Sequence, residues 1–210
     1  MCIRDSGRCW EVSAKLLAML LHTLPGTPFL YQGEEIGMTN VRFPSIELYD
    51  DPDAKNCYRQ TLLEGASEEE ALRQAQLESR DNARTPMQWD SSPQAGFTVG
   101  TPWLPVNPNY KTINVEAQRN DPYSILQCYR RLLSLRREHP VLARGDLEFF
   151  DLPEESLLGY RRSYEGETLL VFHNFSPERA ELPLDLVPKE AKVLLSSYCL
   201  LYTSPSPRDV

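Results

Sequence analysis

The spacing of apolar residues predicts two helices. In residues 11–24 and 124–139, apolar side chains recur every three or four positions, which is typical of a helix with one buried face. Pro25 and Gly26 are expected to end the first helix, and Pro140 the second. The inward positions expected in the second helix are Ile125, Leu126, Tyr129, Leu132, Leu133 and Leu135. Its arginines, Arg136 among them, are expected to face mostly outward.

A short apolar run follows the first helix. Residues 27–31 are expected to form a buried strand, and Gln32-Gly33-Glu34-Glu35 would then lie at its C-terminal end. A helix, a turn and a buried strand make an α/β step, the repeating unit of a parallel barrel, and active sites of such barrels lie at the C-terminal ends of the strands. A further helix is expected to open at Ser67, because a serine N-cap with Glu70 three residues later forms a capping box.

The pattern changes after Pro140. Short alternating runs at 147–150, 157–164, 168–175 and 192–195 predict strands, and Glu165-Gly166 predicts a hairpin turn. Residues 141–198 are therefore expected to form a small antiparallel β domain that is truncated before a sandwich could close. Residues 90–110 are rich in Pro, Gly, Asn and Ser, and we expect a long ordered loop there.

Composition excludes several classes of partner. The 210 residues are 41% hydrophobic and 25% charged, as in a soluble globular protein, and the formal net charge is -8 without a basic run. We therefore expect no nucleic-acid partner and, since no apolar run approaches bilayer length, no membrane partner. His22, His139 and His173 lie far apart, so no metal site is expected.

Cysteine usage favours a reducing compartment. Outside the terminal segments the cysteines are Cys9, Cys57 and Cys128, which are widely spaced and form no CxxC pair. We interpret them as buried or half-buried free thiols, which suits a bacterial cytoplasmic protein. Secretion stays open, because the natural N-terminus is expected to precede this chain.

The two ends share an unusual relationship. Residues 1–6 read MCIRDS and can be encoded by ATGTGTATAAGAGACAG, whose reverse complement contains the codons for Cys-Leu-Leu-Tyr-Thr, the sequence of residues 199–203. Residues 1–6 and 199–210 are therefore expected to be adapter-derived scars, and they are excluded from the fold prediction. The natural sequence would then be cut at both sides.

Four segments carry a family resemblance. They are RDNARTPMQW at 80–89, TPFLYQGEEIGM at 27–38, GTPWLPVNPNY at 100–110 and INVEAQ at 113–118. Together they resemble the alpha-glucosidase branch of the alpha-amylase family, glycoside hydrolase family 13, and most of all its oligo-1,6-glucosidases. The resemblance implies an α/β fold in which residues 7–140 are the C-terminal part of a catalytic (β/α)8 barrel.

The resemblance also implies a chemistry. A retaining, exo-acting alpha-glucosidase would hydrolyse alpha-glucosidic bonds, chiefly alpha-1,6 bonds in short oligosaccharides, and release glucose. The family's catalytic carboxylates precede the matched segments, so no catalytic residue is expected in this chain, which alone is predicted to be inactive. No cofactor is expected here, while a structural calcium in the preceding part stays open.

Two residues are predicted to bind the small oligosaccharide substrate. By the resemblance, Arg80 reaches into the glucose pocket, a task that suits a permanently charged group with several fixed donors. The alternative is a structural role in which Arg80 pairs with Asp81 or a nearby helix and only holds the loop. Asp53 occupies a position near the leaving-group subsite where relatives often carry Glu, and Pro52 before it is a further departure. A solvated acidic turn is the alternative for Asp53.

Neighbouring residues are given structural roles. Glu34 and Glu35 are interpreted as scaffold charges, because adjacent residues of an extended chain point oppositely and cannot both face one bond. Arg84 is expected to form a structural ion pair. Gln88 and Trp89 are expected to anchor the loop, with Trp89 buried, and a stacking platform for a sugar is the alternative for Trp89.

Other functions remain open at this stage. A trehalose-6-phosphate hydrolase or a sucrose isomerase would use the same scaffold. A non-catalytic, transporter-associated glucosidase-like subunit would resemble it too, although retention of Arg80 weighs against that interpretation. The sequence does not indicate the linkage, the substrate length or the oligomeric state.

Overall fold

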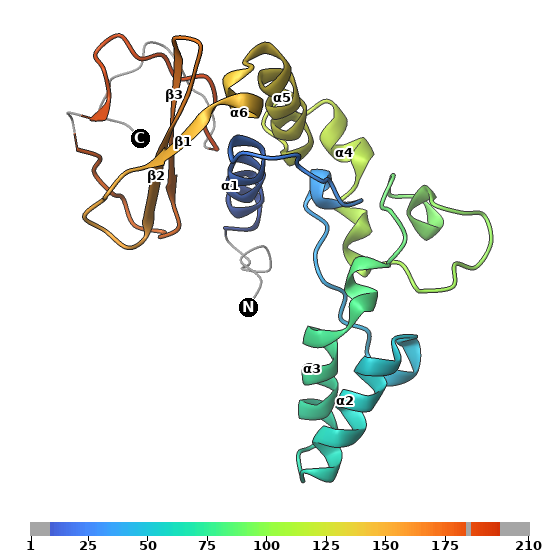
Figure 1. Cartoon of the computed structure of the whole chain (residues 1–210). Coiled ribbons are helices and arrows are strands. Elements are labelled where there is room, and N and C mark those ends of the chain that lie inside the picture. The colour runs from blue at the N-terminus through green and yellow to red at the C-terminus, as the bar shows by residue number, and fades with distance from the viewer. Residues whose placement is uncertain (1–8, 184–185, 198–210) are drawn as a thin grey trace. The chain divides into compact units, whose positions relative to one another are not determined.

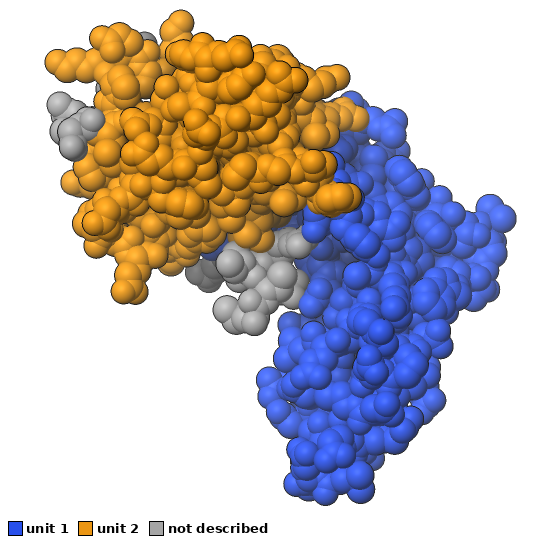
Figure 2. Space-filling model, in the orientation of Figure 1, with its two compact units in different colours: residues 1–10, 30–126 blue, residues 11–29, 127–210 orange. Residues whose placement is uncertain are grey.

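The chain divides into two compact units, each considered by itself (Figure 2). The computed structural model describes residues 9–183 and 186–197. One unit comprises residues 1–10 and 30–126, and the other residues 11–29 and 127–210. The expected adapter-derived segments, 1–6 and 199–210, lie outside the described residues. The domain limits expected at residues 140 and 198 stay predictions.

A helical hairpin dominates the first unit (Figure 1). It is formed by α2 (Pro52–Leu63) and α3 (Glu68–Glu78). Helix α2 begins where the Asp51 side chain accepts the Asp53 N–H at 3.2 Å, with a proline in the first turn. Helix α3 begins where Ser67 Oγ accepts the Glu70 N–H at 3.2 Å, so the predicted serine cap is confirmed.

Small apolar clusters hold the rest of this unit together. Buried Val41, Phe43 and Tyr49 form one cluster, against which Ile46 and Leu72 of α3 pack. Ile36, Met87 and Val115 form another, with Met38 and Leu126 packed around it. The connecting elements are η3 (Glu34–Ile36), η4 (Ile46–Leu48), η5 (Arg80–Ala83), η6 (Pro93–Gly96), η7 (Pro108–Lys111) and α4 (Val115–Arg119).

The buried strand predicted at residues 27–31 is wrong. These residues have no strand hydrogen-bonding pattern, and Phe29, Leu30 and Tyr31 are exposed, Phe29 by 84%. A parallel strand is stabilised by neighbours on both sides, and the one sheet among the described residues is antiparallel and formed by other segments. The apolar run therefore has no ladder to join.

The second unit contains the three-stranded antiparallel sheet. Strands β1 (Asp146–Phe149), β2 (Leu157–Tyr164) and β3 (Glu167–Asn174) pair in the order β1-β2-β3, which confirms three predicted strands. Glu165 and Gly166 both have positive φ, 47° and 86°, as a two-residue hairpin turn requires. The strand predicted at 192–195 is wrong, because this segment pairs with no strand and Val193 and Leu194 are exposed.

Three helices accompany the sheet in the chain: α1 (Trp10–Thr23), α5 (Ile125–Glu138) and the short α6 (Val141–Arg144). The first two confirm the predicted helices. Within α5, the inward position predicted for Leu133 is wrong, because this residue is exposed. Arg136 is half-buried instead of facing solvent. Arg136 Nη1 instead donates to the carbonyl oxygens of His22 at 2.7 Å and Leu142 at 3.1 Å. The carbonyls at a helix C-terminus lack partners within the helix, and the guanidinium supplies them.

A second arginine serves the same end of α1. Arg162 of β2 is fully buried and donates to the carbonyl oxygens of Thr23, Gly145 and Asp146. Next to it, Tyr160 Oη shares hydrogen bonds with Thr23 Oγ1 at 2.6 Å and His173 Nε2 at 3.2 Å. This polar network connects α1 with the sheet. Within the described ranges, no helix has the length and apolar content needed to cross a membrane.

Candidate functional site

The segment that carries Arg80 is a tight turn after α3. Ser79 ends α3 and begins η5, and its buried hydroxyl accepts the Asp81 N–H at 3.2 Å. Asn82 continues the turn, donating from Nδ2 to the Gln76 carbonyl at 2.8 Å and accepting the Val41 N–H at 3.1 Å. The sequence RDN therefore folds into a fixed loop whose side chains diverge.

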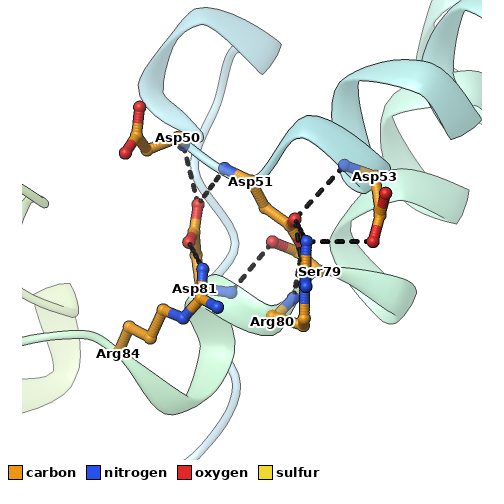
Figure 3. Close-up of polar contacts among 7 residues, drawn as sticks. All are labelled: Asp50, Asp51, Asp53, Ser79, Arg80, Asp81 and Arg84. Carbon is orange, nitrogen blue, oxygen red and sulfur yellow. Dashed lines mark hydrogen bonds and ion pairs between the residues drawn. The ribbon is translucent and has the colours of Figure 1, made fainter.

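Arg80 is held by a buried carboxylate (Figure 3). Asp51 Oδ1 accepts from Arg80 Nη2 at 2.7 Å and from Nε at 3.1 Å, and Asp51 Oδ2 accepts the Arg80 backbone N–H at 2.7 Å. The Asp51 side chain is 0% exposed, while that of Arg80 is 53% exposed. The carboxylate of Asp51 therefore lies below the surface, and the guanidinium of Arg80 lies at the surface.

A second buried acid completes the link between the two segments. Asp81 Oδ2 accepts the backbone N–H groups of Asp50 at 2.7 Å and Asp51 at 2.9 Å. Its other oxygen, Oδ1, lies 3.6 Å from Arg84 Nη1, so the structural ion pair predicted for Arg84 is confirmed. Asp51, at the start of α2, thus accepts from the RDN turn, while Asp81, in the RDN turn, accepts from the start of α2.

The hydrogen bonds to Arg80 keep the pair ionised. They lower the pKa of Asp51 to about 2, against the opposing effect of burial. The same hydrogen bonds and the charge of Asp51 raise the pKa of Arg80 above its usual value. Asp51 therefore stays negative at every pH near neutrality.

The two predicted substrate-binding residues lie together. Asp53 Oδ2 is 2.9 Å from Arg80 Nη2, but the Asp53 side chain is 75% exposed and its ion pair is screened by water. The hydrogen bonds of Arg80 to described residues use its backbone N–H, Nε and Nη2. The Nη1 group of this half-exposed side chain has no such hydrogen bond within the described ranges, so it can donate to an oxygen of a ligand.

The sequence did not reveal the roles of Asp51 and Asp81. A usable signal was present for Asp51, since Asp followed by Pro is a typical start of a helix. Nothing local marked the contact of Asp51 with Arg80, because 29 positions separate them. The hydrogen bonds from Asp50 and Asp51 to Asp81 likewise depend on the packing of α3 against α2.

Glu34 and Glu35 have different surroundings. Glu35 Oε2 accepts the Gly33 N–H at 2.7 Å, which supports its interpretation as a scaffold charge. Glu34 lines a cavity of about 250 Å³. The same cavity is lined by Asn82, Ala83 and Thr85 of the segment that carries Arg80, and Arg80 itself is not among the lining residues.

Gln88 anchors its loop as predicted. Its buried side-chain amide donates to Asn109 Oδ1 at 3.1 Å and to the Ile113 carbonyl. The burial predicted for Trp89 is wrong, since 49% of the residue is exposed. Its backbone N–H donates to the Ala95 carbonyl at 2.9 Å, so the loop is held through the main chain and the indole is free to face solvent. Within the described part of the chain, no three or more His, Cys, Asp or Glu side chains are grouped as metal ligands would be.

Comparison with known proteins places this geometry in a family. The profile of the alpha-amylase family, described as "Alpha amylase, catalytic domain", matches residues 2–145. The chain therefore belongs to the alpha-amylase family, whose catalytic-domain fold is the (β/α)8 barrel, and the predicted resemblance and fold class are confirmed.

Curated relatives refine the similarity. Over 188 residues, the chain is 49% identical to the oligo-1,6-glucosidase of Halalkalibacterium halodurans, a match that covers 89% of this chain and 34% of the relative. It is 40% identical over 197 residues to the trehalose-6-phosphate hydrolase of Bacillus subtilis, covering 92% of this chain and 35% of that protein. The chain thus spans about a third of the length of the relatives it matches.

Solved structures agree with this assignment. A crystal structure of trehalose-6-phosphate hydrolase from Bacillus licheniformis matches with a TM-score of 0.86 and 43% identity, covering 95% of this chain and 37% of that one. The trehalulose synthase MutB from Pseudomonas mesoacidophila matches with a TM-score of 0.76 and 46% identity, covering 83% of this chain and 32% of that chain.

Proposed function

We propose that this chain is part of a retaining, exo-acting alpha-glucosidase that hydrolyses alpha-1,6 bonds in short oligosaccharides and releases glucose. The observation that carries the proposal is the guanidinium of Arg80. One edge is held by a buried acid and Nη1 is open, within a segment 49% identical to an oligo-1,6-glucosidase.

Arg80 would bind the substrate rather than react with it. Its Nη1 donors would hold hydroxyl groups of the glucose unit, and the fixed geometry of the guanidinium would orient the ring. The nucleophile and the general acid would come from residues that precede this chain, so the chain alone would be inactive. Asp53, exposed beside Arg80, would contact the leaving-group side of the substrate.

The charges around Arg80 favour a neutral sugar over a phosphorylated one. Asp51 and Asp53 pair with Arg80, and Asp81 pairs with Arg84, so three carboxylates face two guanidinium groups (Figure 3). A phosphate group is bound by an excess of donors and positive charge. Trehalose-6-phosphate hydrolysis remains the second candidate, because a relative with that name is 40% identical.

Features of the sequence support two further parts of the proposal, the compartment and the kind of partner. A bacterial cytoplasmic enzyme fits the free cysteines Cys9, Cys57 and Cys128 and the bacterial origin of the relatives, although Cys9 is exposed and not buried or half-buried as expected. The net charge of -8 supports a neutral sugar partner rather than nucleic acid. No cofactor is proposed for this segment.

The test is a substrate panel with the full-length protein that contains this chain. Isomaltose, trehalose 6-phosphate and sucrose would be supplied to the wild type and to Arg80→Ala, and the products quantified. We expect glucose release from isomaltose to exceed turnover of the other two, and Arg80→Ala to lower kcat/KM about 10- to 100-fold. Preferred cleavage of trehalose 6-phosphate, or unchanged kinetics in the variant, would contradict the proposal.

A further inference from the structure

We propose that Asp51 is the positioning residue for Arg80: it clamps both the main chain and the guanidinium of this arginine so that Nη1 is presented to the sugar. The inference rests on the proposed function of Arg80. Asp51 itself cannot touch a substrate, because its side chain is completely buried.

The clamp holds Arg80 at both ends of its side chain. Asp51 Oδ2 accepts the backbone N–H of Arg80 at 2.7 Å, and Oδ1 accepts Nε at 3.1 Å and Nη2 at 2.7 Å. An exposed arginine ordinarily samples many rotamers, and ordering it costs free energy when a ligand binds. Here the side chain is ordered before the sugar binds, because one buried acid holds both the backbone N–H of Arg80 and its guanidinium.

Burial distinguishes Asp51 from the other acid on the same nitrogen. Asp53 Oδ2 lies 2.9 Å from Nη2, a distance close to that of Asp51, but its side chain is 75% exposed. An exposed ion pair contributes little and can rearrange, whereas a buried acid whose partner moves away is left uncompensated. The cost of displacing the guanidinium therefore comes chiefly from Asp51.

The cap of α2 can be separated from the clamp. Asp51 Oδ1 also accepts the Asp53 N–H at 3.2 Å, so Asp51 begins the helix as well. Asn and Ser serve as N-caps about as well as Asp. Asn lacks the charge and one acceptor oxygen, and Ser is too short to reach the guanidinium. Asp51→Asn and Asp51→Ser are therefore expected to keep the helix while releasing Arg80.

The experiment is a double-mutant cycle in the full-length protein, with isomaltose as substrate. Asp51→Asn and Asp51→Ser would each be made alone and together with Arg80→Ala, and kcat/KM and melting temperature measured. Asp50→Asn is the matched control, because it makes the same change at the adjacent residue, whose side chain points away from Arg80 in Figure 3. We expect Asp51→Asn to lower kcat/KM about tenfold or more, and Asp50→Asn to change it less than about twofold.

The cycle identifies how Asp51 acts. If Asp51 works through Arg80, then Asp51→Asn changes kcat/KM less than about twofold once Arg80 is alanine. An equal loss in both backgrounds would show a general structural role and overturn the proposal, as would wild-type kinetics in both Asp51 variants. If Arg80→Ala alone has no effect, the proposed function fails first, which is a distinct outcome. Should one Asp51 variant not fold, the other gives the same comparison.

Discussion

The Asp81 carboxylate accepts the backbone N–H of Asp51 at 2.9 Å, while the Asp51 carboxylate accepts the backbone N–H of Arg80 at 2.7 Å. Both carboxylates are fully buried, and each one accepts a hydrogen bond from the segment that contains the other. The start of α2 and the RDN turn are thereby joined by two independent sets of hydrogen bonds. Replacing either acid would therefore remove hydrogen bonds that hold the two segments together.

The first prediction concerns Asp81. Asp81→Ala removes the acceptor for the N–H groups of Asp50 and Asp51, and a buried donor without a partner costs about 1–3 kcal/mol. We expect the full-length protein to lose roughly that much stability in chemical denaturation. Ser45→Ala, which removes a single cap hydrogen bond at exposed η4, is the control and should cost less. Equal losses of stability in the two variants would show that the buried hydrogen bonds of Asp81 contribute no more than an exposed helix cap.

The second prediction concerns two glycines with positive φ. Gly37 has φ 67° and Gly65 has φ 92°, so alanine is strained at both. A Cβ on Gly37 would lie 2.5 Å from Ile125 Cδ1 and 3.0 Å from the Trp10 ring, whereas one on Gly65 would have nothing within 4 Å. Gly37→Ala should therefore destabilise by at least about 1 kcal/mol more than Gly65→Ala. Equal melting temperatures for the two variants would contradict the packing around Gly37.

The third prediction concerns pH. Burial lowers the pKa of His173 to about 4 from 6.5, so the folded protein keeps this residue neutral where the unfolded chain binds a proton. Well above pH 6.5 the residue is neutral in both states, so its titration does not change stability there. As the pH falls from 6.5 to about 4, proton uptake by the unfolded state should remove up to about 3 kcal/mol.

Comparison of melting temperatures at pH 7 and pH 4.5 tests this in the full-length protein. His173→Gln cannot titrate, so its melting temperature should fall less over this interval than that of the wild type. The difference between the two pH values is the relevant quantity, because the substitution also alters packing against Tyr160. An identical fall in both proteins would mean that His173 is not held neutral by the fold.

The fourth prediction concerns this chain produced by itself. Phe29, Leu30 and Tyr31 are exposed and have no strand partner among the described residues, so apolar surface faces water. We expect the isolated chain to bind the dye ANS strongly and to aggregate as its concentration rises. A soluble monomer with a cooperative calorimetric melt and no dye binding would contradict this expectation.

The sequence was informative wherever a local rule decides the structure. Ser67 with Glu70 marked the start of α3, and Glu165-Gly166 marked the hairpin, because capping and turn geometry depend only on near neighbours. It was misleading at residues 27–31, since a strand depends on partners that the pattern of one segment cannot supply. Helix α2 escaped notice because its sequence is largely polar and only Ala54 is buried.

The candidate site divides in the same way. Arg80 and Asp53 were found through the family resemblance, and the structure brings them to 2.9 Å. Asp51 could not be found in this way, because its role comes from packing that joins residues 29 positions apart. The contacts of Arg136 were equally hidden, since a cation on a helix is ordinarily solvated, and the carbonyls of His22, Gly26 and Leu142 that accept from it belong to other segments.

Arg162 bears on the order in which the second unit assembles. Its guanidinium exchanges water for three carbonyl oxygens from two distant parts of the chain, Thr23 on one side and the adjacent Gly145 and Asp146 on the other. Losing hydration is unfavourable until both parts have come together. Enclosure of this cation should therefore be a late event in folding. Substitutions at Arg162 would then accelerate unfolding while leaving the refolding rate nearly unchanged.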